Sequence, residues 1–343
     1  MRLLPVRTVT AALVPAALLL PVTAAPAAVA AETPGAAGFT ITDPRIKESS
    51  GLAASRLHPG VYWTHNDSDD GPYVYAVDGA TGRTVARLTL TGIGTPRDVE
   101  AISLGPDGQL YVGDIGDNRG GTWDHVWIYR FPEPKTLGDA TVRAEQFTVT
   151  YADGPRDAEA LMVHPVTGRV YIASKNERGG GLYEGPERLS ADGRNVFRRI
   201  GDVPWVTDGA FSPDGTRLTL RGYLTARTWA WADGGIRGEG ERVGAPFQGQ
   251  AESVTYSADG RTLLFGAEGA GSRVVAVPVA PAGADPSAAP SPGRSGAPAP
   301  GPAGGAGAAG QDGGGYGKGA LVLVAGTLVV LGAKRLLRRR PKD

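Results

Sequence analysis

Residues 96–102 read Pro-Arg-Asp-Val-Glu-Ala-Ile, and residues 155–161 repeat them as Pro-Arg-Asp-Ala-Glu-Ala-Leu. Each copy continues through a turn into a short apolar segment that contains a tyrosine, at 110–114 in the first copy and 170–174 in the second. Short runs of Val, Ile, Leu and Tyr between turns are typical of β-strands. The repeated unit is therefore expected to be a group of strands.

Three weaker copies of the unit indicate the period of the repeat. They are marked by Ser-Gly-Leu at 50–52, Asp-Gly-Ala-Phe at 208–211 and Glu-Ser-Val at 252–254. With 50, 100, 159, 208 and 252 as anchors, the spacings are 50, 59, 49 and 44 residues. Periods of about 40–50 residues with hairpin turns are typical of propeller blades, each built of four strands. The sequence predicts an all-β fold, a single β-propeller of five four-stranded blades over residues 38–280. Six blades are the fallback, and an open β-sandwich is the main alternative.

The last repeat is one strand short, and this predicts how the ring closes. Only three strand-like segments follow position 250, and the third is at 273–277. The segment 38–42, Gly-Phe-Thr-Ile-Thr, offers the missing fourth strand. Pairing the first segment with the last would remove both open edges of the sheet system. We therefore expect the N-terminal strand to close the propeller.

The two ends of the chain predict where the protein is located. Residues 1–30 have basic positions, an apolar stretch and a final Ala-Val-Ala, as in a secretory signal peptide, and 31–37 form a short segment before the propeller. In 281–317, 32 of 37 residues are Ala, Gly, Pro or Ser, which predicts a disordered stalk. The segment 318–337 is mainly apolar and predicts a transmembrane helix, and 338–343 is a basic tail that should stay cytoplasmic. We expect a single-pass cell-membrane protein with an extracellular propeller.

Composition excludes several functional classes. Residues 8–280 hold 25 basic and 32 acidic residues, so this part is near −7 and lacks the cationic surface that nucleic-acid binding needs. The chain has no cysteine, which excludes disulfides and thiolate metal sites. It has no dinucleotide fingerprint and no phosphate-binding Gly-Lys-Ser/Thr loop, so neither a nucleotide nor a haem cofactor is expected.

The repeat also predicts a functional rim. In a propeller, the innermost strand of each blade starts at one rim, and the next strand, being antiparallel, ends at the same rim. Acidic residues lie where the innermost strands should start, and further polar residues lie where the second strands should end. The candidate metal ligands are Glu100, Glu159, Asp208 and Glu252. The remaining candidates for the ligand rim are His65, Asn66, Asp67, Asp98, Asp114, Asp157, Lys175, Arg221 and Glu268.

Crowded carboxylates repel each other, and three arrangements would relieve the repulsion. A divalent cation could be bound by their oxygens, for which calcium is suited. One carboxylate could keep its proton at neutral pH and serve as a general acid. Alternatively, nearby cations could pair with the acids as a purely structural network. The basic candidates for such pairing are Arg97, Arg156, Lys175 and Arg221.

The Asp-x-Glu-Ala-(Ile/Leu) motif, followed by Pro-x-(Asp/Thr)-Gly-x-(Leu/Val)-Tyr, resembles the WD-repeat-like and phytase-like secreted β-propellers of bacteria. The resemblance covers about 240 residues. The resemblance implies the propeller fold. By analogy with phytase-like and lactonase-like members, it also implies that acidic residues at the starts of innermost strands bind calcium or another divalent metal. It does not extend to the phosphate-binding residues of phytases, which have no assignable counterparts here.

These observations favour a binding module, a membrane-anchored propeller that presents an acidic rim to an extracellular ligand or an envelope partner. The alternative is a hydrolase that uses the same rim, either metal-assisted on a phosphoester or lactone or carboxylate-driven on a glycan. A structural envelope protein is the third interpretation. Which ligand or substrate is recognised depends on loops whose sequences carry no readable code.

Overall fold

The structure is a computed structural model that describes residues 36–68 and 70–279. Within these ranges every regular element is a β-strand. The described residues include no helix that is long and apolar enough to cross a membrane. The predicted signal peptide, stalk, transmembrane helix and basic tail lie outside the described residues.

Most strands form successive antiparallel meanders of four. The first contains β2 (Ser49–Ala54), β3 (Val61–Asn66), β4 (Tyr73–Asp78) and β5 (Thr84–Thr91), and the second contains β6 (Val99–Leu104), β7 (Gln109–Asp114), β8 (Val126–Pro132) and β10 (Glu145–Tyr151). The third contains β11 (Ala158–Val163), β12 (Val170–Ser174), β13 (Gly180–Glu184) and β14 (Arg194–Val203), and the fourth contains β15 (Asp208–Phe211), β16 (Arg217–Arg221), β17 (Ala226–Ala232) and β18 (Gly235–Val243). The last sheet has the order β1 (Phe39–Thr40), β21 (Arg273–Pro278), β20 (Thr262–Ala267) and β19 (Ala251–Tyr256).

Two parallel pairings join neighbouring meanders at their outer edges. β9 (Ala140–Arg143) follows β8 in the chain but pairs with β5, so it adds a fifth strand to the first sheet. β10 pairs with β14, which merges the second and third meanders into one eight-stranded sheet. Both pairings cover outer edge strands that would otherwise expose unpaired backbone groups.

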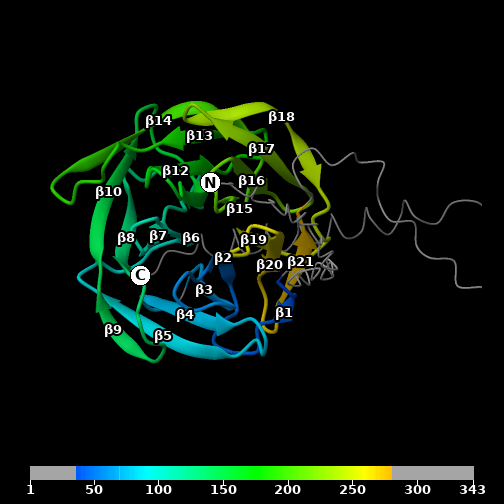
Figure 1. The fold of residues 1–343 in the computed structure, drawn as a ribbon. Helices are drawn as coiled ribbons and strands as arrows, with labels where there is room; N and C mark the ends of the chain where they lie inside the picture. Colours follow the sequence, from blue (N-terminus) through cyan, green and yellow to red (C-terminus); the bar gives the residue numbers. More distant parts are fainter. Residues whose placement is uncertain (1–35, 69, 280–343) are drawn as a thin grey trace, which may run out of the picture. The chain divides into compact units, whose positions relative to one another are not determined.

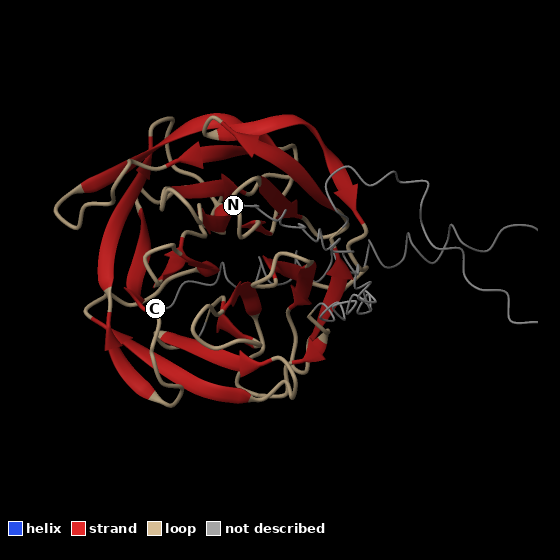
Figure 2. Cartoon of the chain, in the orientation of Figure 1, coloured by secondary structure: helices blue, strands red, loops and turns tan. Residues whose placement is uncertain are grey.

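The meanders are arranged around a common axis as in a β-propeller (Figure 1). Their first strands contact one another in a closed cycle, in the order β2, β6, β11, β15, β19 and back to β2. The other strands of each meander follow outward, and Figure 2 shows only strands and loops in the ring. The predicted all-β propeller fold is therefore present.

β1 pairs antiparallel with β21, with Phe39 opposite Val274, which is the predicted pairing of the first segment with the last. The backbone N–H and the hydroxyl of Thr42 both donate to the carbonyl of Gly82, at 2.8 and 2.9 Å. Gly82 has a φ of 71° and lies so close to Thr40 that a Cβ would collide with its carbonyl. Glycine is the residue that satisfies both conditions.

Apolar side chains fill the spaces between neighbouring sheets. One buried cluster joins the first and second meanders and includes Trp63, Leu88 and Phe131. Another joins the third and fourth meanders and includes Trp229 and Trp231. These contacts hold the sheets face to face, and they account for both tryptophans as packing residues.

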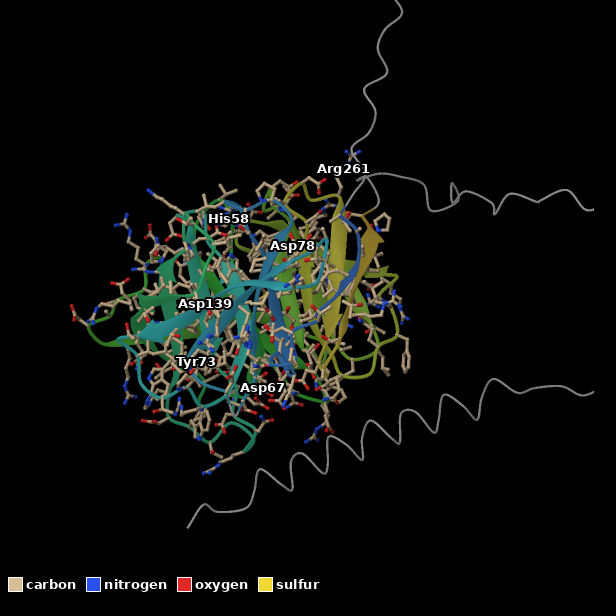
Figure 3. The ribbon with its side chains drawn as sticks, turned by 90° about the horizontal axis from the view of Figure 1, so that it is seen from below. His58, Asp67, Tyr73, Asp78, Asp139 and Arg261 are labelled. Carbon is tan, nitrogen blue, oxygen red and sulfur yellow. The ribbon has the colours of Figure 1, made fainter. Side chains whose placement is uncertain are left out.

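The two rims of the ring differ in what they carry. Figure 3 places Asp67 and Tyr73 at one end of the molecule and His58, Asp78 and Arg261 at the other. The first is called the site rim below, because the innermost strands start there. The backbone N–H of Val279, the last described residue, donates to the Arg261 carbonyl at 2.8 Å. The described chain therefore ends at the rim opposite the site rim.

Candidate functional site

A repeated backbone hydrogen bond positions the side chains of the site rim. The same bond occurs in four of the meanders. Its donor is a backbone N–H one or two residues after the end of the second strand. Its acceptor is the carbonyl of the residue that precedes the innermost strand. This bond continues the antiparallel pairing past the ends of the two strands and fixes one donor residue per meander at the site rim. The four bonds are Asp67 to Glu48 at 2.9 Å, Gly116 to Asp98 at 3.1 Å, Lys175 to Asp157 at 2.8 Å and Glu268 to Gln250 at 2.9 Å.

A pocket of about 620 Å³ opens at this rim. Seven of the predicted site residues line it, drawn from four of the meanders and from the loops beside them. They are Asp67, Glu100, Asp157, Glu159, Lys175, Glu252 and Glu268. These residues lie at or beside the starts of innermost strands and the ends of second strands.

Three glutamates are the most buried acidic side chains that line the pocket, and they are called its floor below. Glu100, Glu159 and Glu252 are 3%, 1% and 4% exposed. Burial raises the pKa of Glu252 to about 8, against the opposing effect of Lys175. Burial also raises the pKa values of Glu100 and Glu159, with neighbouring carboxylates adding to the effect. Removing a carboxylate from water disfavours its charged form, so this floor favours either bound cations or bound protons.

Lys175 is the lysine of this floor. Its Nζ hydrogen-bonds to Glu159, and its side chain is 20% exposed. Burial opposes its charge, but Glu159 and other neighbours outweigh that effect and raise the pKa of Lys175. The ammonium also lies 5.8 Å from the centre of the Tyr223 ring.

Asp67, Asp98 and Glu100 form the group best suited to hold a metal ion. Each offers a carboxylate oxygen, and these oxygens all lie within 4.8 Å of one another. Among the described residues this is the one such group of three acidic or histidine side chains. Asn118 donates its Nδ2–H to Asp98 Oδ2 at 2.8 Å and fixes that carboxylate.

Gly116 leaves room for these oxygens. A Cβ at this position would lie 2.6 Å from Asp98 Oδ2 and 2.8 Å from Glu100 Oε1. Any side chain there would therefore occupy the space between the two carboxylates. An all-oxygen donor set with open space fits a hard divalent cation such as Ca²⁺.

Asp208 and Arg221 are placed outside the pocket lining. Asp208 is buried, and its Oδ2 accepts the N–H of Val254 at 2.7 Å. Arg221 is 1% exposed and donates to the carbonyls of Ser253 and Gly266, at 2.7 and 2.5 Å. Both residues connect the fourth meander to the fifth and have a structural role.

Two other predicted rim residues, Asn66 and Asp114, accept backbone hydrogen bonds, and a third, His65, is buried. The Asn66 side chain accepts the N–H groups of Lys47 and Glu48. Asp114 accepts the N–H groups of Arg97 and Asp98 and the hydroxyl of Tyr129. His65 is buried, and burial lowers its pKa to about 4. Asn66 and Asp114 shape the loops that carry the site.

The purely structural interpretation of the acids applies to only part of the rim. Lys175 pairs with Glu159, as that interpretation expected. Arg156 pairs instead with Asp153 at 2.8 Å. The Arg97 guanidinium stacks 4.0 and 3.8 Å from the ring centres of Trp123 and Trp127. These arginines therefore hold the surrounding loops, and Lys175 is the candidate that reaches the glutamates of the floor.

Sequence reasoning missed three residues that shape the pocket: Asn118, Trp205 and Tyr223 line it. The Tyr223 ring packs edge-on against Trp205, with 5.2 Å between the ring centres. All three lie in loops outside the repeated motif. No signal in a single sequence distinguishes them from other loop residues.

No protein-family model matches the chain, and no curated protein matches it either. Among solved structures, a PQQ-bound aldose sugar dehydrogenase from Streptomyces coelicolor aligns at 12% identity and a TM-score of 0.43, covering 71% of this chain and 99% of that one. A gluconolactonase from Xanthomonas campestris aligns at 15% identity and 0.42, covering 70% and 79%. The RRP9 WD40 repeats align at 12% and 0.36, covering 67% and 79%.

Proposed function

We propose that the chain is a cell-surface binding protein whose acidic pocket holds a divalent cation and, with it, recognises a ligand or partner outside the cell. The group of Asp67, Asp98 and Glu100, with oxygens within 4.8 Å of one another, carries this proposal. Ca²⁺ is the expected ion because every donor is an oxygen.

The proposal includes the finer architecture. Five meanders, with first strands in a closed cycle, are taken as five blades, and the β1–β21 pair is taken as their closure. The stalk and membrane helix are proposed from the sequence alone. Because Val279 bonds to Arg261 at the opposite rim, the stalk would start at the rim opposite the pocket.

We expect calorimetric titration of the full chain with CaCl₂ to give one bound ion. Asp98→Asn should weaken binding at least about tenfold, because one charged donor of three is lost. Gly116→Ala should do the same without removing any charge, because its Cβ lies between the two carboxylates.

The matched control is Gly201→Ala, where a Cβ meets nothing within 4 Å. It should bind Ca²⁺ like the wild type. Equal Ca²⁺ binding by Gly116→Ala and Gly201→Ala would place the ion elsewhere, and no binding by the wild type would reject the cation proposal altogether.

Hydrolysis is the second candidate function, and Glu252 is the observation that favours it. A buried carboxylic acid with a pKa of about 8 keeps its proton at neutral pH and can pass it to a leaving oxygen while water supplies the hydroxyl. We expect such an activity, if present, to be found by screening phosphoesters, lactones and glycosides, and to fall at least about a hundredfold in Glu252→Gln. Turnover that Glu252→Gln leaves unchanged would exclude this role.

A further inference from the structure

Structurally equivalent positions at the site rim carry side chains of opposite charge. The four residues fixed by the repeated backbone bond are Asp67, Gly116, Lys175 and Glu268. On one side of the pocket, Asp67 and the open space at Gly116 border the carboxylates of Asp98 and Glu100. On the other side, the equivalent position places an ammonium group against Glu159.

The Lys175 ammonium supplies a positive charge on its side of the pocket. It hydrogen-bonds to Glu159, and its charge also acts on Glu252 and Glu100. Its backbone N–H is held by the Asp157 carbonyl, and the Tyr223 ring lies beside the ammonium. Lys175 is therefore held in place from its backbone to its Nζ.

Glu252 gives independent evidence that this side of the pocket could hold a cation. Its side chain is more than nine-tenths buried and lines the pocket. Its Oε2 has no hydrogen-bond partner among the described residues. Burying a carboxylate oxygen without a partner costs free energy unless a cation or a proton binds to it.

We propose that Lys175 limits the pocket to one divalent cation, because its ammonium fills a second cation site formed by Glu159 and Glu252. The inference rests on the proposed function for the first site, at Asp67, Asp98 and Glu100. Without the lysine, Glu159 and Glu252 would keep their oxygen donors and lose their resident cation. A second metal ion would then have a site.

The test counts bound Ca²⁺ by calorimetric titration of the full chain. We expect one equivalent for the wild type, two for Lys175→Gln and one for Lys175→Arg, which keeps the charge. The double variant Lys175→Gln/Glu252→Gln should return to one, because a donor of the second site is lost.

The possible outcomes separate the two proposals. One equivalent for both the wild type and Lys175→Gln would overturn the inference and leave the first site intact. No ion for the wild type and one for Lys175→Gln would support the inference and reject the first site.

A measurement on the wild type keeps the inference testable if Lys175→Gln does not fold. Acylation of lysines by an amine-reactive ester, read out by peptide mass spectrometry, reports the accessibility of Lys175. We expect saturating Ca²⁺ to leave its reactivity unchanged, because ion and lysine occupy different sites. An increase in reactivity with Ca²⁺ would mean that the two compete for one site, and the inference would fail.

Discussion

Arg221→Met is expected to lower the free energy of unfolding by about 3–5 kcal/mol, because each hydrogen bond from a charged donor to a buried carbonyl contributes about 1.5–3 kcal/mol. Arg221 Nη1 donates to the carbonyls of Ser253 and Gly266, and its Nη2 donates to Gln248 at 3.0 Å. Methionine fills similar space but donates no hydrogen bond. Two buried carbonyls would lose a donor, and the neighbouring carboxylates would lose a nearby positive charge.

The matched control is Arg227→Met on the adjacent strand β17. Arg227 is half-buried and donates to the carbonyls of Glu239 and Gly240 at 2.9 and 3.0 Å, close to solvent. Its loss should cost no more than about 1.5 kcal/mol, because water can replace it. Urea denaturation of both variants gives the comparison, and equal losses would contradict the network role of Arg221.

The repeat predicted the fold well because it reports backbone geometry. Strand-like apolar segments and a glycine turn between the first two strands recur in each unit, and they specify the hairpins whatever the other loops do. The innermost strands β6 and β11 start within the two matching heptapeptides. The parallel pairings of β9 with β5 and of β14 with β10 were not predicted, because pairing between outer strands leaves no periodic signal in the sequence.

The site was predicted less completely because the fourth repeat departs from the others. There the N–H of Thr207 donates to the Arg221 carbonyl, so the regular bond from the second strand is absent. Gly222 packs against the Trp205 carbonyl with no room for a side chain, and the following Tyr223 lines the pocket. The sequence pattern placed Asp208 and Arg221 at the rim by analogy, but this local backbone change directs them to the interface between meanders.

The second large effect is a fall in stability with rising pH, caused by Glu252. Its pKa is about 8 in the folded protein, against 4.5 for an ordinary glutamate side chain, so folding favours the protonated form. This contribution is fully present below pH 4.5 and is lost as pH rises toward and through 8. Between pH 7 and 8.5 we expect the free energy of unfolding to fall by about 1–1.5 kcal/mol from this group. Urea denaturation in EDTA at the two pH values measures the fall.

The pH window matters because His65 has the opposite effect at lower pH. Burial lowers its pKa to about 4, below the ordinary histidine value of 6.5, so its contribution to stability rises with pH over that range and is nearly constant above pH 7. Above pH 7, Glu252→Gln should therefore flatten the fall, since glutamine has no proton to lose. A slope that Glu252→Gln leaves unchanged would assign the effect to other groups.

Bound Ca²⁺ should reduce the fall in stability between pH 7 and pH 8.5. An ion bound at Asp67, Asp98 and Glu100 supplies positive charge to a floor whose neighbouring carboxylates raise one another's pKa values. It should lower the pKa of Glu252 and reduce the preference of the folded state for its proton. We therefore expect Ca²⁺ to stabilise the protein more at pH 8.5 than at pH 7, as the difference between denaturation curves with CaCl₂ and with EDTA. Stabilisation by Ca²⁺ that is equal at both pH values would show that the ion binds too far from Glu252 to share its pocket.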